Sequence, residues 1–249
     1  MRAITLTETG GPSVLTPTKS HPVPKPKSGE ILVKNDYAGI NFIDTYFRTG
    51  LYPTPKENFP LVLGQEGIGS VADANGNSAG LKEGDKVVWM KGGSYAEYAT
   101  VSAERAVKVP EGANEQHILG GFLMGMTALS LTQEAYPVKK GDKVLVHAAA
   151  GGMGLLLCQI LRDTGAYVIG TAGSGEKCEL AKKNGADEAV NYNELEGEKW
   201  VKKVKELAGG EGVDVVYDSV GKTTWEGSLD AVKRKGKGEF RNINLCWRC

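Results

Sequence analysis

The sequence predicts two domains of different fold class, a β-rich domain over residues 1–123 and an α/β domain over residues 124–249. In the first, short apolar runs are separated by Gly, Pro and Asn at close intervals, which is typical of small antiparallel barrels or sandwiches. In the second, short apolar runs alternate with stretches of helical length, which predicts βαβ units and a parallel sheet covered on both faces. Glycine is abundant, with 34 of 249 residues against a usual share of roughly 7%, so its placement is informative.

The expected elements follow from these patterns. In the β-rich domain the expected strands are residues 30–34, 67–72, 86–90 and 94–101. In the α/β domain the expected strands are residues 143–147, 167–171, 188–192 and 213–218, and the expected helices are residues 155–162, 176–183, 199–208 and 225–233.

Composition excludes several classes of function. The 30 basic and 30 acidic side chains give a formal net charge of zero, so nothing draws the chain to nucleic acid or to an anionic membrane. No apolar run approaches the roughly 20 residues that span a bilayer, and the N-terminus lacks the pattern of a signal peptide. Four cysteines do not make a disulfide scaffold. We therefore expect a cytoplasmic protein with no membrane partner, and nucleic acid is an unlikely ligand.

The clearest local signal is residues 148–154, AAAGGMG, between an expected strand and an expected helix. That context is the one in which a glycine-rich turn indicates nucleotide binding. Small residues let the backbone approach a pyrophosphate, and the helix N-terminus offers unpaired N–H groups and a partial positive charge. The turn therefore predicts dinucleotide binding, with a simple tight turn as the alternative. The residues expected to contact the dinucleotide are Ala150, Gly151, Gly152, Met153 and Gly154.

The end of the second expected strand of this domain indicates which dinucleotide binds. NAD sites place Asp or Glu there to bind the ribose hydroxyl, but this chain has Gly173 and Ser174, and Glu176 lies on the next helix. A 2′-phosphate needs a cation and hydrogen-bond donors and is repelled by a carboxylate. Ser174, Lys177 and Tyr192 meet that need, so we predict NADPH. The alternatives are a solvated helix residue at Lys177 and strand-end packing at Tyr192.

Other polar residues of this domain receive weaker assignments. Ser219 ends the fourth expected strand with Asp218, and we expect it to shape the floor of the ribose and nicotinamide site. His21, His117 and His147 are scattered without metal or triad spacing, and we expect all three to be structural.

Longer motifs carry a resemblance that runs from residue 1 to about 237. They include AGINFIDTYFRTGLYP, LGQEGIG, GSYAEYATV, PVKKGDKVLVHAAAGGMG and GVDVVYDSVGK. In these motifs the chain resembles the zeta-crystallin-like quinone oxidoreductases, a zinc-free branch of the medium-chain dehydrogenase/reductase superfamily. The resemblance implies a GroES-like β-barrel domain followed by a Rossmann-type parallel sheet. It also implies that full-length relatives form dimers.

The resemblance also assigns residues to the chemistry. Where zinc-dependent relatives have Cys and His, this chain has Asn41 and Gln65, which supply neither thiolate nor imidazole. We expect no metal, because a quinone is already electrophilic and needs only an oriented hydride donor and a hydrogen bond. Asn41 and Gln65 are the expected amide donors, and Tyr46 and Tyr52 the expected stacking and hydroxyl residues, with loop packing as the alternative for each tyrosine. Thr127 matches a family position beside the nicotinamide.

The resulting hypothesis is an NADPH-dependent quinone oxidoreductase that needs no metal. One alternative is an enoyl or alkenal reductase of the same superfamily, which would accept an activated enone. Another is a non-catalytic nucleotide- or RNA-binding protein of the zeta-crystallin type.

The resemblance breaks after Lys237, before the length of full relatives is reached. We expect residues 238–249 to be an aberrant tail and the parallel sheet to be incomplete, lacking its fifth and sixth strands, among them the strand that pairs relatives into dimers. We expect this form to bind cofactor weakly and to turn over little.

Overall fold

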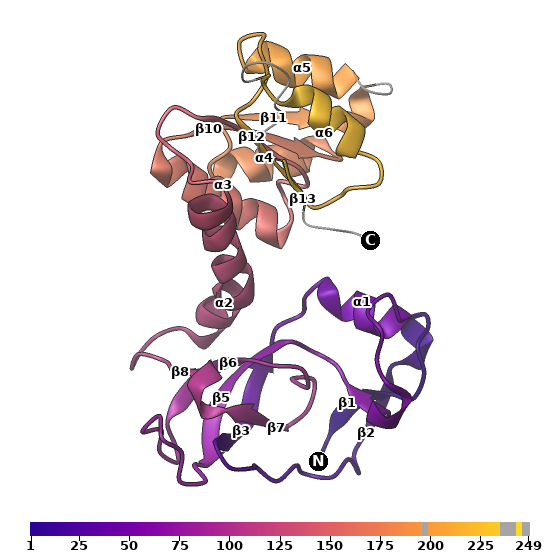
Figure 1. Cartoon of the computed structure of the whole chain (residues 1–249), viewed down its shortest axis with the longest axis vertical. Helices are drawn as coiled ribbons and strands as arrows, with labels where there is room; N and C mark the ends of the chain where they lie inside the picture. The colour runs from indigo at the N-terminus through magenta and orange to yellow at the C-terminus, as the bar shows by residue number, and fades with distance from the viewer. Residues whose placement is uncertain (196–198, 235–242, 246–249) are drawn as a thin grey trace. The chain divides into compact units, whose positions relative to one another are not determined.

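The computed structural model describes residues 1–195, 199–234 and 243–245. The chain divides into two compact units, residues 1–123 and 124–249 (Figure 1). The elements of the first unit are β1 (Ala3–Leu6), β2 (Thr16–Thr18), β3 (Glu30–Ala38), α1 (Ile43–Thr49), β4 (Leu61–Val62), β5 (Glu66–Asp73), β6 (Lys86–Met90), β7 (Tyr98–Ser102) and β8 (Ala106–Lys108). Helix α2 (Glu115–Leu129) runs across the boundary between the units.

The elements of the second unit are a π-helical turn (Ser130–Ala135), β9 (Lys143–Val146), α3 (Gly152–Thr164), β10 (Tyr167–Ala172), α4 (Gly175–Lys183), β11 (Glu188–Asn191), a 3-10 turn (Tyr192–Glu194), α5 (Lys199–Leu207), β12 (Val215–Asp218), α6 (Trp225–Ala231) and β13 (Ile243–Leu245). None of the helices in the described ranges combines the length and apolar character needed to cross a membrane.

The first unit is built on antiparallel strands. Five of them pair in the order β7-β3-β5-β6-β8, and three others in the order β2-β1-β4. Alternate residues of β3 and β6 enter one core, including Ile31, Val33 and Val87 around the fully buried Trp89. The indole Nε1 of Trp89 donates to Asn35 Oδ1 at 3.2 Å, so the polar atom of this large side chain is satisfied.

The second unit is a parallel sheet in the order β11-β10-β9-β12-β13. Its strands are apolar throughout because both faces are covered. Val144 and Val146 of β9 pack in the cluster that contains α3 and α4 residues, whereas Leu145 packs in the cluster that contains α5 residues. The strand order reverses between β9 and β12, which is the point at which open α/β sheets bind their ligands.

The structure confirms the predicted fold class, with shifts at element ends. The expected strand over residues 94–101 starts only at Tyr98, and the expected helix over residues 225–233 ends at Ala231. The helix stops there because Val232 forms a parallel bridge with Val213 beside β12.

The expectation that the sheet lacks a fifth strand is wrong. The backbone of β13 pairs in parallel with β12, with Ile243 opposite Val216 and Leu245 opposite Asp218. A strand edge presents unpaired N–H and C=O groups, which a short extended segment satisfies. The other residues of the predicted aberrant tail, 238–242 and 246–249, lie outside the described residues.

We predict that Trp89→Ala destabilises the first unit by about 3–5 kcal/mol, because it removes the largest side chain of that core and leaves a cavity. The check is denaturant unfolding of both forms. The matched control is Trp225→Ala, since Trp225 is 45% exposed and its loss should change stability little. Equal losses in the two variants would contradict this account of the core.

Candidate functional site

The glycine-rich turn is held close to the end of β9. Ala148 has a positive φ of 49°, and its carbonyl accepts the Gly151 N–H at 2.9 Å. A Cβ added at Gly154 would collide with the Ala148 carbonyl and the Ala149 backbone, so only glycine allows this approach of helix to strand. Gly151 is the N-cap of α3 and provides no side-chain cap. The first N–H groups of α3 therefore lack an intrahelical or side-chain acceptor and suit an anion.

Four of the predicted cofactor residues meet at the switch point of the sheet. Thr127, Met153, Gly154 and Ser219 line one small depression of about 20 Å³. The other residues of the turn lie beside it, with Gly151 and Gly152 exposed and Ala150 half-buried.

The residues predicted to bind a 2′-phosphate lie at or beside the turn after β10. Ser174 caps α4, and its hydroxyl accepts the Lys177 N–H at 3.3 Å. A Cβ added at Gly173 would lie 2.9 Å from the Tyr192 hydroxyl oxygen, and Asn193 Nδ2 donates to the Gly173 carbonyl at 2.7 Å. The turn after β11 is thus tied to the turn after β10. Lys177 is exposed and forms no ion pair within the part of the chain that the structure describes.

A second depression, of about 330 Å³, lies beside Tyr192. Its lining residues are His147, Thr171, Tyr192, Leu195, Trp200, Val220, Thr223 and Thr224. His147 lines this depression and the small one at the switch point. Five of the eleven cofactor residues predicted from sequence therefore line one or the other of these two hollows, which share His147.

A buried polar network lies beneath these hollows. His147 Nδ1 is 2.9 Å from the Thr171 hydroxyl, and Nε2 is 3.1 Å from the Ser228 hydroxyl. Ser228 in turn donates to Asp218 Oδ2 at 2.7 Å. Burial lowers the pKa of His147 to about 4, although the Asp218 carboxylate acts in the opposite direction. The imidazole is therefore neutral at neutral pH.

Asp218 is the anionic end of this network. Burial alone would raise its pKa, but hydrogen bonds reverse the direction and hold the pKa below its ordinary value. Oδ1 accepts the N–H groups of Val220 and Gly221 at 2.8 and 2.9 Å. Oδ2 accepts the hydroxyl of Thr224 at 2.7 Å in addition to that of Ser228. The carboxylate thus fixes the loop that carries Ser219.

In the first unit, Asn41 is joined to a buried carboxylate. Its Nδ2 donates to Glu66 Oε1 at 2.7 Å, and Glu66 Oε2 accepts the Leu123 N–H at 2.9 Å. Burial raises the pKa of Glu66, while these two hydrogen bonds act against that shift. One N–H of the Asn41 amide is thereby committed, which leaves one for another acceptor. Gln65 is half-buried, and its backbone carbonyl accepts the Lys91 N–H at 3.0 Å.

Tyr46 and Tyr52 are brought together on and after α1. Their ring centroids are 5.2 Å apart at 55°, and the Tyr52 N–H donates to the Tyr46 carbonyl at 3.1 Å. Phe42 packs edge-on against Tyr46 at 5.6 Å, and Phe47 against Tyr52 at 5.5 Å. Phe42 is 57% exposed and Tyr52 38% exposed. The result is an aromatic cluster (Phe42, Tyr46, Phe47, Tyr52) with accessible ring surface.

A glycine-rich turn at the switch point of a parallel sheet is typical of dinucleotide-binding proteins, and an antiparallel β-unit precedes it in this chain. Comparison with known proteins agrees. The family described as "Alcohol dehydrogenase GroES-like domain" matches residues 27–111, and the family described as "Zinc-binding dehydrogenase" matches residues 152–238.

Individual relatives narrow the class. A quinone oxidoreductase of Salmonella typhimurium is 43% identical over 229 residues, covering 91% of this chain and 68% of the relative. A probable quinone oxidoreductase of Schizosaccharomyces pombe is 44% identical over 228 residues, covering 91% and 67%. The structure of an Escherichia coli quinone oxidoreductase complexed with NADPH matches with a TM-score of 0.88 at 40% identity, covering 94% of this chain and 71% of that one. The chain belongs to the quinone oxidoreductase family of the medium-chain dehydrogenase/reductase superfamily.

Sequence reasoning did not find the network of His147, Thr171 and Ser228. The one available signal was the position of His147, directly before the glycine-rich turn at the end of a strand. Its partners are 24 and 81 residues away, and no local pattern indicates such contacts.

We predict that the free energy of unfolding decreases as the pH is lowered from about 6.5 to about 4, because of His147. The unfolded chain gains a proton on this imidazole as the pH falls through 6.5, whereas the folded chain stays neutral until about pH 4. At about 1.36 kcal/mol per pH unit, the loss reaches about 3 kcal/mol. Denaturant unfolding across this range should show a flatter profile for His147→Gln than for the wild type.

The matched control for this prediction is His117→Gln, since His117 is exposed, and its profile should follow that of the wild type. A His147→Gln profile as steep as the wild type would contradict the assignment.

Proposed function

We propose that this chain is a quinone oxidoreductase that takes hydride from NADPH and needs no metal. The main support for NADPH over NADH is the turn after β10. Ser174, Lys177 and Tyr192 lie at or beside this turn, and no carboxylate stands at the end of the strand. The relatives named quinone oxidoreductase and the related structure complexed with NADPH support the same reading.

The residues present fit this cofactor. The glycine cradle at Gly154 and the uncapped start of α3 suit the pyrophosphate. Ser174, Lys177 and Tyr192 suit a dianionic 2′-phosphate, since they offer a cation and hydroxyl donors. Thr127, Met153 and Ser219 lie together at the switch point, and we assign the nicotinamide half to that edge of the sheet. When bound, NADPH supplies a hydride from its nicotinamide ring.

The aromatic cluster of the first unit suits a flat acceptor. Tyr46 and Tyr52 present ring surface for stacking, and neither hydroxyl donates to another described side chain, so both are available. We propose that the Tyr52 hydroxyl donates to the acceptor oxygen that gains negative charge. A donor already oriented at that oxygen stabilises the transition state without reorganisation. The remaining N–H of Asn41 and the amide of Gln65 are the proposed neutral donors in place of zinc ligands.

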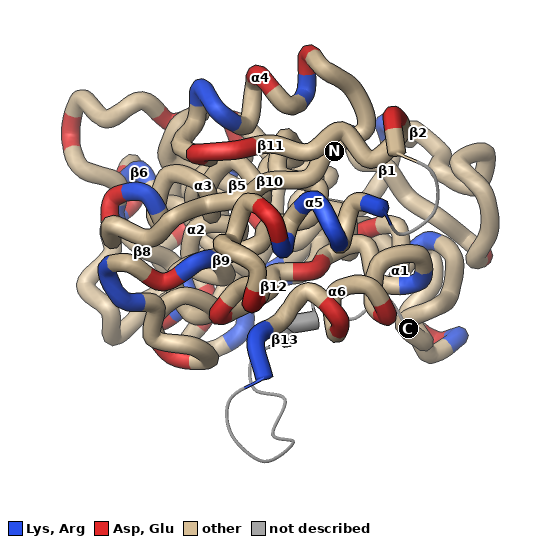
Figure 2. The backbone as a smooth tube through the Cα atoms, turned by 90° about the horizontal axis from the view of Figure 1, so that it is seen from above, with Lys and Arg blue, Asp and Glu red and all other residues tan. Residues whose placement is uncertain are grey.

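Two alternative functions, enone reduction and RNA binding, can be distinguished from quinone reduction. An activated enone uses the same cofactor, and a substrate panel that includes quinones and enones distinguishes the two acceptors. RNA binding requires a basic stripe with interleaved aromatic residues. Figure 2 shows Lys and Arg interspersed with Asp and Glu along both units, which does not favour that partner.

We also propose a cytoplasmic location. The two cysteines among the described residues, Cys158 and Cys178, are buried free thiols. Burial raises the pKa of Cys158 to about 12, so this thiol stays protonated and inert. Unpaired thiols are typical of a reducing compartment.

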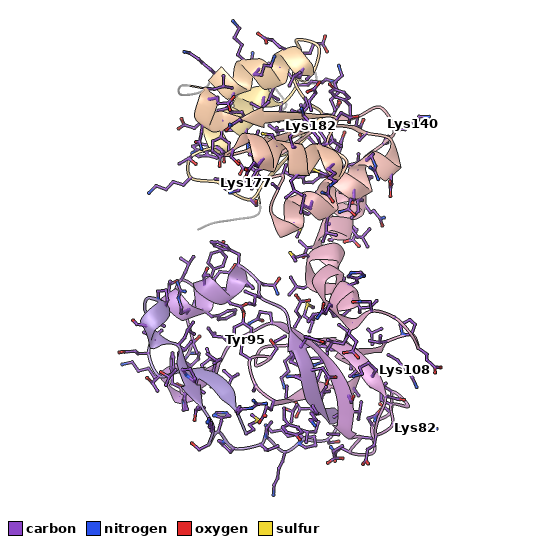
Figure 3. All side chains as sticks on the ribbon, turned by 180° about the vertical axis from the view of Figure 1, so that it is seen from behind. Lys82, Tyr95, Lys108, Lys140, Lys177 and Lys182 are labelled. Atoms are coloured by element: carbon purple, nitrogen blue, oxygen red, sulfur yellow. The ribbon has the colours of Figure 1, made fainter. Side chains whose placement is uncertain are left out.

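We predict that Lys177→Ala raises the KM for NADPH about tenfold and leaves the KM for NADH unchanged, because it removes the cation that faces the 2′-phosphate. Steady-state kinetics with both cofactors give the measurement. Lys182→Ala is the matched control on the same helix (Figure 3), since Lys182 pairs with Glu179 at 3.4 Å. An equal rise for both cofactors, or an effect as large in the control, would count against the phosphate site.

We predict that Tyr52→Ala lowers turnover of 9,10-phenanthrenequinone or 1,4-benzoquinone about a hundredfold, through loss of both ring and hydroxyl. Tyr52→Phe separates the two, because it keeps the ring and should lose about tenfold through the missing hydrogen bond alone. Tyr98→Phe, on β7, is the control. Turnover unchanged in Tyr52→Ala would remove Tyr52 from the mechanism.

A further inference from the structure

The buried network around His147 is the feature that the proposed function does not use. His147, Ser228 and Asp218 are 3%, 0% and 1% exposed, and the chain neighbours of two of them, Val146 and Tyr217, belong to one buried apolar cluster. Burying polar groups costs free energy unless every hydrogen bond is made, and apolar residues of similar size serve a core as well or better. Three such groups at the ligand edge of a sheet therefore call for a role beyond packing.

The hydrogen bonds run in one consistent direction. Asp218 is an acceptor, so the Ser228 hydroxyl donates to it at 2.7 Å and has only its lone pairs left for His147. His147 Nε2 must then carry the hydrogen, and Nδ1 accepts from the Thr171 hydroxyl at 2.9 Å. Neutral His147 satisfies both partners at once. This assignment follows from the donors and acceptors of the network.

The network joins the elements that form the site. His147 follows β9, Thr171 lies on β10, Asp218 ends β12 and Ser228 lies on α6. The imidazole also packs edge-on against Trp200 of α5, with centroids 4.9 Å apart at 88°. One ring thus contacts Thr171, Ser228 and Trp200 from three other elements, and Ser228 connects it to Asp218.

The His147 ring lies at the wall of both hollows. His147 and Asp218 line the hollow at the switch point, and His147, Thr171 and Trp200 line the larger hollow beside Tyr192. Ser228 lines neither hollow and is fully buried. Any effect of Ser228 on a ligand must therefore pass through His147 or Asp218.

We propose that His147 is a positioning residue for the cofactor, which sets the strand ends of β9, β10 and β12 relative to one another through Thr171 on one side and Ser228 with Asp218 on the other. This inference rests on the proposed function, because it concerns the edge of the sheet at which that function places NADPH. His147 itself is not a catalytic residue, and its role is transmitted by its two partners.

The test measures the Kd for NADPH in Thr171→Val, in Ser228→Ala and in the double variant. Each single variant should raise the Kd about tenfold, and the double variant no more than the larger single, because the ring loses its orientation once either partner is removed. The KM for NADPH should rise with the Kd, whereas the KM for the quinone should not. Thr171→Ser keeps the hydroxyl and should retain wild-type affinity.

The matched control is Thr132→Val, another buried threonine of the second unit, whose hydroxyl donates to the Ala128 carbonyl at 2.8 Å. It should lose stability without a change in Kd. Two results would overturn this inference but leave the proposed function standing. One is single variants that bind NADPH as tightly as the wild type, and the other is a double variant whose increase in Kd is the product of the two single increases. A wild type that does not bind NADPH would overturn the proposed function and the inference together.

Discussion

The turn between β9 and α3 leaves no space for a side chain at Gly154, because the helix starts against the Ala148 carbonyl and the Ala149 backbone. This close approach is the constraint on which the candidate site depends. It sets the first N–H groups of α3 at the carboxyl edge of the sheet, where the strand order reverses. A helix that started farther from the strand would leave no backbone surface for a pyrophosphate.

The neighbouring strand ends build on this constraint with side chains. Ser174 starts α4 and positions the Lys177 backbone, while Asn193 ties the following turn to the Gly173 carbonyl. Behind these residues, neutral His147 hydrogen-bonds to Thr171, and the Asp218 carboxylate accepts hydrogen bonds from the protein, including one from Ser228. We propose that these contacts hold the strand ends in position. The proposed ligand-binding surface therefore lies above a buried network in which the Thr171, His147 and Ser228 donors each meet an acceptor.

Much of the fold was predictable because its signals are local. The alternation of apolar runs and helical stretches after β9 is a pattern within each segment, and so is the glycine-rich turn with its strand and helix. Helix α1 was not predicted because its seven residues lie in a loop-like stretch, and α2 was obscured by Gly120, Gly121 and Gly125. Strand β13 was not predicted because its pairing depends on the edge of β12 and not on its own pattern.

The candidate site also contains local features that the sequence indicates and non-local contacts that it does not. The tight turn at Gly154 and the cap at Ser174 could be predicted because they depend on neighbours within a few residues, whereas the cofactor roles of these residues and of Lys177 stay predictions. The contact between His147 and Ser228, 81 residues apart, and that between Asn41 and Glu66, 25 residues apart, arise only when the sheets form. Non-local polar contacts carry no periodic signal, and a single sequence does not reveal them.

The most direct test of the central claim is calorimetric titration of the chain with adenosine 2′,5′-bisphosphate and, in parallel, with AMP. The two ligands differ only in the phosphate that the turn after β10 is proposed to bind, so turnover and acceptor do not enter the comparison. The account predicts that the bisphosphate binds at least about tenfold more tightly. Equal affinities, or tighter binding of AMP, would contradict it.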